Sequence, residues 1–159
     1  MDTTKKTIIV FSGDLDKLLA AFVIANGAAA MGDDVTMFFT FWGLNALRKD
    51  GASTAEGKSS LQKMFAKMLP KTPSDAPLSR MNMGGMGARM MKKVMREQNV
   101  DNLETMRSLA VEQEIKMIAC TMSMDVMGVK EEELIDGVEF AGVATYLGDA
   151  DEANVNLFI

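Results

Sequence analysis

Residues 7–40 carry the stretch of sequence that decides the fold, TIIVFSGDLDKLLAAFVIANGAAAMGDDVTMFFT. Its first five and last six residues are continuous β-branched, aromatic and apolar runs, which are typical of strands covered on both faces. Between them, residues 15–31 are apolar on nearly every side, as in a helix that packs against both a sheet and a neighbouring element. Strand, helix and strand within about 35 residues predict a right-handed βαβ unit.

The chain after residue 40 keeps alternating helices and strands. Strands are predicted at 115–119, 138–141 and 155–159, helices at 61–69, 88–98, 103–113, 121–127, 130–135 and 144–153, and a helical turn at 44–49. Ser59 or Ser60 stands where the helix from 61 needs a cap, and Asn102 does so for the helix from 103. This order predicts an α/β protein, a three-layer α/β/α sandwich around a mostly parallel sheet of about five strands.

Length and composition predict a single domain over residues 1–159. A partly irregular insertion is expected at 50–87, because residues 50–60 are mostly small and polar and all three prolines fall between 70 and 77. The segment 70–80 is expected to be an irregular surface loop. Neither a signal peptide nor a membrane-spanning segment is expected from the apolar runs.

Charge and residue types exclude several classes of function. The 17 Lys and Arg against 22 Asp and Glu leave a net charge of −5, so nucleic acid is not an expected partner. Without histidine, Ser-His-Asp catalysis, Cys-His catalysis and imidazole zinc sites are excluded, and neither a metal nor another cofactor is expected. A lone cysteine forms no disulfide within the chain, which indicates a reducing compartment and predicts a cytoplasmic protein.

Three segments follow predicted strands, and they should meet at one edge of a parallel sheet, where ligands bind in such folds. The residues concerned are Ser12, Gly13 and Asp14, then Phe41, Trp42 and Gly43, and finally Cys120 with Thr121, Met122, Ser123 and Asp125. Together they predict a pocket with Cys120 as its reactive group. Asp14 is better explained as a helix cap, and Trp42 is either a pocket wall or buried against the sheet or a subunit interface.

Cys120 is the most informative of these residues. Its position between a strand and a helix places the sulfur near free backbone N–H groups and the positive end of the helix dipole, which lower a cysteine pKa and favour the reactive thiolate. The alternative is that Cys120 is a small buried hydrophobe, because free cysteine is among the most buried residue types.

Four motifs resemble the DsrE/DsrF-like family, in the branch related to the DsrE-like domains of CoA-disulfide reductases. They are SGDLDK at 12–17, TFWGL at 40–44, MNMGG at 81–85 and ACTMSMD at 119–125. The resemblance covers nearly the whole chain. It implies an α/β/α sandwich around a parallel sheet, a homo-oligomer such as a trimer or hexamer, and a cysteine at position 120 that carries persulfide sulfur between proteins.

The leading hypothesis is therefore a sulfur-relay protein that accepts sulfane sulfur on Cys120 from a donor protein and passes it to an acceptor protein. One alternative is non-catalytic binding of a small nucleotide or CoA-like ligand in the same pocket. Another is a scaffold oligomer that uses residues 81–95 as its apolar contact surface. Whether the protein is an enzyme stays open, as does membrane association, to which no residue points.

Overall fold

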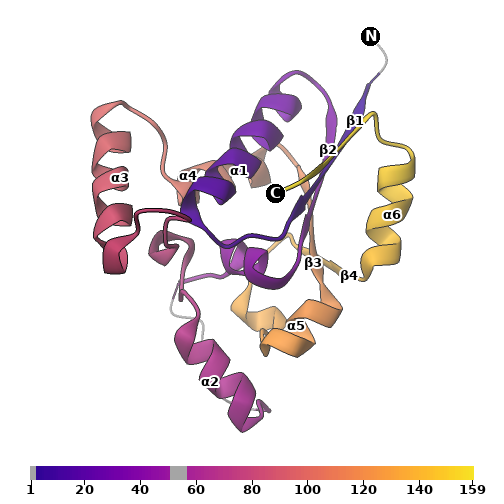
Figure 1. Cartoon of the computed structure of the whole chain (residues 1–159). Coiled ribbons are helices and arrows are strands. Elements are labelled where there is room, and N and C mark those ends of the chain that lie inside the picture. The colour runs from indigo at the N-terminus through magenta and orange to yellow at the C-terminus, as the bar shows by residue number, and fades with distance from the viewer. Residues whose placement is uncertain (1–2, 51–56) are drawn as a thin grey trace.

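The computed structural model of the chain describes residues 3–50 and 57–159, and it contains a parallel sheet (Figure 1). The strands are β1 (Lys5–Val10), β2 (Asp34–Phe39), β3 (Lys116–Cys120), β4 (Glu139–Ala141) and β5 (Val155–Phe158). Their order is β4-β3-β2-β1-β5, and every neighbouring pair is parallel. The predicted α/β/α sandwich around a parallel sheet is confirmed.

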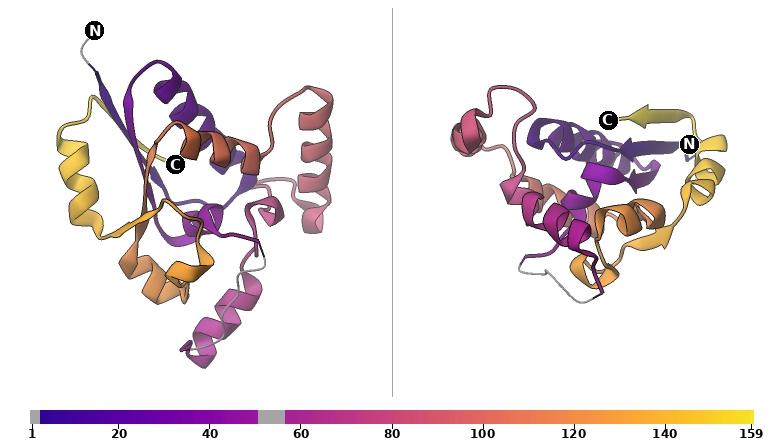
Figure 2. Two further views of the ribbon diagram at one scale, coloured as in Figure 1. Left: turned by 180° about the vertical axis from the view of Figure 1, so that it is seen from behind. Right: turned by 60° about the horizontal axis from the view of Figure 1, so that its bottom comes forward.

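In the described residues, six α-helices accompany the sheet, together with short 3₁₀ segments. The helices are α1 (Leu15–Ala30), α2 (Ser60–Met68), α3 (Met86–Glu97), α4 (Leu103–Glu112), α5 (Thr121–Met127) and α6 (Val143–Asp151). The 3₁₀ segments are η1 (Phe41–Leu47), η2 (Pro73–Asp75), η3 (Met83–Gly85) and η4 (Glu131–Glu133). Helices α1 and α4 pack against each other on one side of the sheet, α6 covers the other side, and α2 and α3 lie at the periphery (Figure 1, Figure 2). Within the described part of the chain, no helix combines the length and apolar character that crossing a bilayer demands.

Several local predictions need correction. The turn predicted at 44–49 is the 3₁₀ segment at 41–47, and the helix predicted at 130–135 shortens to the 3₁₀ turn η4. The proline-rich segment is not a simple surface loop, because Pro73 and Ala76 are buried and the Pro77 carbonyl accepts a hydrogen bond from the first amide of α1. Part of the predicted insertion, residues 51–56, lies outside the described residues.

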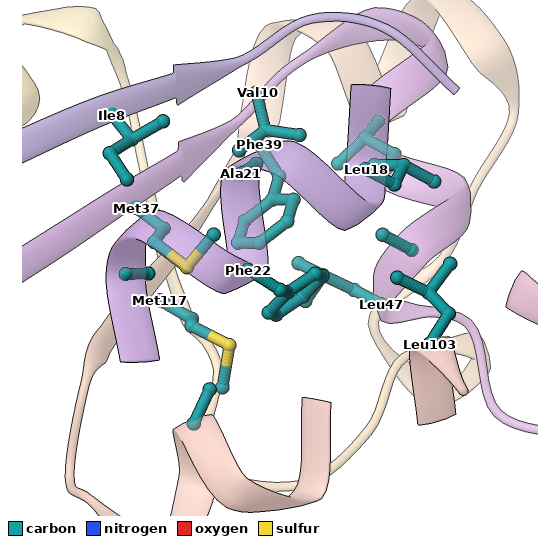
Figure 3. Packing of buried hydrophobic residues seen from close by; sticks show 14 of the residues in the cluster. Ile8, Val10, Leu18, Ala21, Phe22, Met37, Phe39, Leu47, Leu103 and Met117 are labelled. Atoms are coloured by element: carbon teal, nitrogen blue, oxygen red, sulfur yellow. The ribbon is translucent and has the colours of Figure 1, made fainter. Parts of the chain in front are cut away.

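The strands divide their side chains between two apolar layers of unequal size, because successive strand residues point to opposite faces. The larger core lies on the α1 side, where strand residues such as Ile8, Met37 and Phe39 belong to one cluster with Phe22 of α1 (Figure 3). The opposite face holds a small cluster of Phe38, Ile118, Cys120 and Tyr146, and Tyr146 is the one buried residue of α6. The α6 side is therefore the thinly covered face of the sheet.

A buried group of charges, the Glu133 cluster, holds the start of the insertion against the body. It consists of Arg48, Lys58 and Glu133, whose side chains are at most 2% exposed. Both Glu133 carboxylate oxygens lie 2.9 Å from Lys58 Nζ, and Arg48 Nη2 lies 3.5 Å from Oε1. The Lys130 amide also donates to this carboxylate at 2.7 Å. Sequence reasoning missed this cluster, since charged residues in polar segments are mostly solvated.

Candidate functional site

The carboxyl edge of the sheet carries a pocket built from three separate segments. The loop after β1 contributes Ser12, Gly13 and Asp14, and η1 contributes Trp42 and Asn45. The third segment runs from the end of α2 into the proline-rich stretch and contributes Met68, Leu69, Pro70 and Pro77. The cavity has a volume of about 380 Å³ and is lined by Ser12, Gly13, Asp14, Trp42, Asn45, Met68, Leu69, Pro70 and Pro77. Ser12, Gly13 and Asp14 of the first predicted segment and Trp42 of the second thus line one cavity, whereas Phe41 and Gly43 do not line it.

Two glycines allow the first two segments to approach so closely. A Cβ on Gly43 would lie 2.0 Å from the carbonyl oxygen of Val10, and a Cβ on Gly13 would lie 2.7 Å from the carbonyl oxygen of Trp42. The Gly43 amide also donates to the Phe11 carbonyl at 2.9 Å. Gly13 and Gly43 are therefore spacing residues that set the pocket wall, since neither site has room for a side chain.

Asp14 begins α1, but its side chain does not cap the helix. The Asp14 carboxylate makes no cap hydrogen bond, accepts a weak one from Ser12 Oγ at 3.3 Å, and lies 3.6 Å from Lys17 Nζ. The Leu15 amide instead donates to the Pro77 carbonyl at 2.7 Å. The capping interpretation of Asp14 was wrong because a carbonyl from a distant segment replaces it. The carboxylate is instead held by Ser12 and Lys17, in a residue that lines the pocket.

The next carboxylate along α1 is held differently. Partial burial pushes the pKa of Asp16 upward, but hydrogen bonds from the hydroxyl and amide of Ser79 outweigh that effect and hold the pKa below its ordinary value. Asp16 does not line the cavity. It is a structural carboxylate beside the pocket and a useful control for Asp14.

Aromatic rings continue from the pocket across the sheet edge. Trp42 is 41% exposed and meets Phe41 edge-on, Phe41 stacks on Phe11 at 5.6 Å between centroids, and Phe11 stacks on Phe158 at 5.7 Å. Phe41 therefore supports Trp42 without lining the cavity itself. Sequence reasoning did not name Phe11 or Phe158, although both stand at the carboxyl ends of strands.

Cys120 lies away from this pocket. It is 3% exposed and belongs to the small cluster of Phe38, Ile118 and Tyr146 on the α6 face, beside Ala141 of β4 in the strand register. It occupies the N-cap position of α5, but its side chain makes no cap hydrogen bond. In this conformation Cys120 packs as a small hydrophobe, which is the alternative that the sequence left open.

The residues after Cys120 also take places outside the pocket. Ser123 is fully buried, and its hydroxyl lies 2.7 Å from that of Thr40, which joins α5 to the end of β2. Met122 is 62% exposed on the outer side of α5. Thr121 and Asp125 line a different cavity of about 290 Å³ together with Lys130, Glu131 and Glu132. One continuous pocket around all three segments is therefore not formed.

Five pocket residues were missed by sequence reasoning, namely Asn45, Met68, Leu69, Pro70 and Pro77. Four come from the end of α2 and the proline-rich segment, which carry no strand-end signal. Asn45 is 4% exposed, and within residues 3–50 and 57–159 its side-chain amide makes no hydrogen bond. Among the described residues, no three His, Cys, Asp or Glu side chains gather so that they could hold a metal ion.

The fold and this edge define a class of protein: a doubly covered parallel α/β sheet with a cavity and a lone cysteine at the carboxyl ends of its strands. Comparison with known sequences then identifies the family. The family model described as DsrE/DsrF/DrsH-like matches residues 3–158. The chain belongs to the DsrE/DsrF/DrsH-like family.

Two curated relatives match along essentially their full lengths. The uncharacterized protein YrkE of Bacillus subtilis is 52% identical over 157 residues, covering 99% of this chain and 98% of that protein. The sulfur carrier protein DsrE2 of Allochromatium vinosum is 36% identical over 159 residues, covering 100% of both chains.

Solved structures share the fold at low sequence identity. The YchN protein of E. coli aligns with a TM-score of 0.57 at 15% identity, over 99% of this chain and 100% of its own. The protein MTH1491 of Methanobacterium thermoautotrophicum aligns with a TM-score of 0.55 at 12% identity, over 98% and 99%. These likenesses support the sandwich architecture.

Proposed function

We propose that this protein is a sulfur carrier that holds sulfane sulfur as a persulfide on Cys120. The observation that carries the proposal is full-length similarity to a protein named as a sulfur carrier, in a chain whose single thiol stands between β3 and α5. Family membership supports a sulfur-relay role in general. The partners would be donor and acceptor proteins, in a reducing compartment such as the cytoplasm, where a lone thiol stays reduced.

The proposed chemistry is thiol exchange on sulfur. The Cys120 thiolate attacks the outer sulfur of a donor persulfide, the donor's S–S bond breaks as a new one forms on Cys120, and the donor leaves as a thiolate. An acceptor thiolate then repeats the step on the Cys120 persulfide, which returns the Cys120 thiolate. No external oxidant is consumed, and no histidine is required.

Burial of Cys120 means that transfer needs a local opening of the α6 side. The cover over the thiol is thin, because β4 has three residues and lies at the sheet edge, and α6 buries only Tyr146. Helix α6 is held by the Tyr146 hydroxyl, 3.1 Å from that of Thr7, and by Asp149, 2.8 Å from Lys116 Nζ. Elements with few buried contacts open at low free-energy cost, so we infer that β4 and α6 gate the thiol.

Intact-mass analysis after incubation with polysulfide or a persulfidated donor tests the carrier role. The wild-type chain should gain ~32 Da, one sulfur atom, and Cys120→Ser should gain nothing.

The rate of Cys120 alkylation tests the gating by α6. Alkylation of native Cys120 should be slow. Tyr146→Phe should accelerate it about two- to tenfold, because a net hydrogen bond of about 0.5–1.5 kcal/mol no longer holds α6.

Leu147→Ala serves as the matched control, since Leu147 is on the same helix and 50% exposed, and this variant should alkylate at the wild-type rate. A wild-type chain that gains no sulfur from any donor would contradict the carrier role. Equal alkylation rates in the wild type and Tyr146→Phe would contradict gating by α6.

A second proposal, a homo-oligomer such as a trimer or hexamer, is favoured by the surface around α3. We define the 81–95 surface by the exposed side chains of Met81, Met83, Met86 and Met90, which are 57–78% exposed. Exposed apolar side chains that are close in the sequence favour an interaction surface, and methionine adapts to a partner's shape.

Light scattering of Met86→Glu/Met90→Glu tests this surface. We expect the molar mass to fall to that of the monomer, because two carboxylates in the contact would have to be desolvated. Met31→Glu is the control, since Met31 is 82% exposed at the end of α1, and it should leave the mass unchanged. An oligomer that survives the double substitution would exclude the 81–95 surface as its contact.

A further inference from the structure

The lining of the pocket beside Trp42 includes one side-chain amide residue, Asn45. Asn45 is 96% buried by residue, lines the cavity, and has no side-chain hydrogen bond within the described residues. Its backbone carbonyl is used, since it accepts from the Arg48 amide. Among the described residues, the fully buried side-chain polar atom without a partner is Arg48 Nε and not an atom of Asn45, so cavity water can reach the Asn45 amide and a ligand can replace that water.

The rest of the lining indicates what that group is. Trp42 offers a flat aromatic wall, and Met68, Leu69, Pro70 and Pro77 supply apolar surface. Asp14 is the single charged residue of the lining, and its carboxylate is not engaged in helix capping. The pocket thus combines one planar apolar wall, one amide that both donates and accepts, and one acceptor carboxylate.

We propose that this pocket binds a planar nitrogen heterocycle of the nucleobase or nucleoside class. A side-chain amide matches the adjacent donor and acceptor on a base edge, and an aromatic wall accepts a stacked ring. The Asp14 carboxylate accepts hydrogen bonds from an exocyclic amino group or from ribose hydroxyls. The volume of about 380 Å³ lies within the range of small-ligand pockets.

The same lining selects against phosphorylated ligands. None of the nine lining residues is basic, and the ammonium group of Lys17 beside the pocket is already paired with Asp14 at 3.6 Å. Of the nucleotide or CoA-like ligands expected from the sequence, the pocket therefore fits the base end and not the phosphates. This site does not depend on Cys120, which lies in a different cluster, so the inference stands apart from the sulfur-carrier proposal.

The single tryptophan makes the test direct. Emission of Trp42 in the full-length protein is followed while adenosine, guanosine or cytidine is added, with calorimetry as a second readout. We expect saturable binding of at least one nucleoside, and weaker binding of the matching monophosphate and of CoA. Absence of saturable binding for every nucleoside, or tighter binding of the phosphorylated forms, would overturn the proposal.

Substitutions separate recognition from folding. Asn45→Leu and Asp14→Asn should each weaken nucleoside binding about tenfold or more, because a hydrogen bond to the ligand is lost. The thermal midpoint of Asn45→Leu should be no lower than that of the wild type, since its amide has no partner within the described fold. Asp16→Asn, which alters the Ser79-bonded carboxylate outside the pocket, should bind as the wild type does. Unchanged affinity in both pocket variants would refute the assignment.

Discussion

Replacing Glu133 by alanine is expected to lower the free energy of unfolding by about 3–5 kcal/mol, because it leaves two buried cations without the carboxylate that they share. Lys58 and Arg48 have side chains that are 2% exposed, and Glu133 is fully buried. Since whole domains are stable by only about 5–15 kcal/mol, this loss brings the fold close to unfolding. Urea denaturation followed by circular dichroism measures it.

A milder change and a surface control make that result interpretable. Glu133→Gln keeps the shape and should remain folded enough to measure, with a smaller loss than the alanine variant. Combining it with Lys58→Met in a double-mutant cycle should reveal a coupling energy, because the two side chains share two contacts of 2.9 Å. Glu97→Ala removes an exposed partner of Lys93 at 3.8 Å and should change stability by at most about 0.5 kcal/mol. Similar losses for Glu133→Ala and Glu97→Ala would show that the buried cluster does not stabilise the fold.

Gly43→Ala is expected to cost at least about 3 kcal/mol, at the upper end of overpacking effects. The added methyl group would lie 2.0 Å from the Val10 carbonyl oxygen, which belongs to rigid backbone and not to a flexible side chain. Relief requires η1 to move away from β1, which would break the bonds from the Gly43 amide to Phe11 and from the Thr40 amide to Val10. Thermal and urea unfolding measure the loss, and Trp42 emission should report the moved pocket wall.

Gly27→Ala is the control, and it should change the free energy of unfolding in the opposite direction. Gly27 lies inside α1, and an added Cβ there would meet nothing within 4 Å. Alanine should therefore raise stability by about 0.5–1 kcal/mol, as expected for a helix interior. If Gly43→Ala were as stable as the wild type, the close approach of η1 to β1 would not be what sets the pocket wall.

Local signals in the sequence predicted most of the elements. The βαβ unit at 7–40 was correct because its strands are continuous apolar runs and its helix is bounded by Ser12–Asp14 and by Gly32. The caps Ser59 and Asn102 were correct because capping depends on residues within three positions of each other. The capping interpretation of Asp14 failed because Pro77, more than sixty positions away, satisfies the helix instead.

The site was predictable only in part. The sequence predicted that the Ser12–Asp14 loop lies beside Trp42, because parallel strands end at the same edge of a sheet. The face on which Cys120 lies did not follow, because a strand residue points to either side depending on register and sheet twist, which neighbouring strands decide. Cys120 lies on the α6 face of the sheet, and its thiol is therefore separate from the pocket.

The sequence by itself therefore determined the order of strands and helices, the lone thiol and the absence of histidine, because these depend on residue identity and short-range pattern. Only the tertiary structure decided that Cys120 packs in a cluster with Tyr146, that Asn45 lines the pocket, and that Glu133 is buried between two cations. Each of these depends on side chains brought together from distant positions. Their energies arise from burial and desolvation, which exist only once the chain has packed.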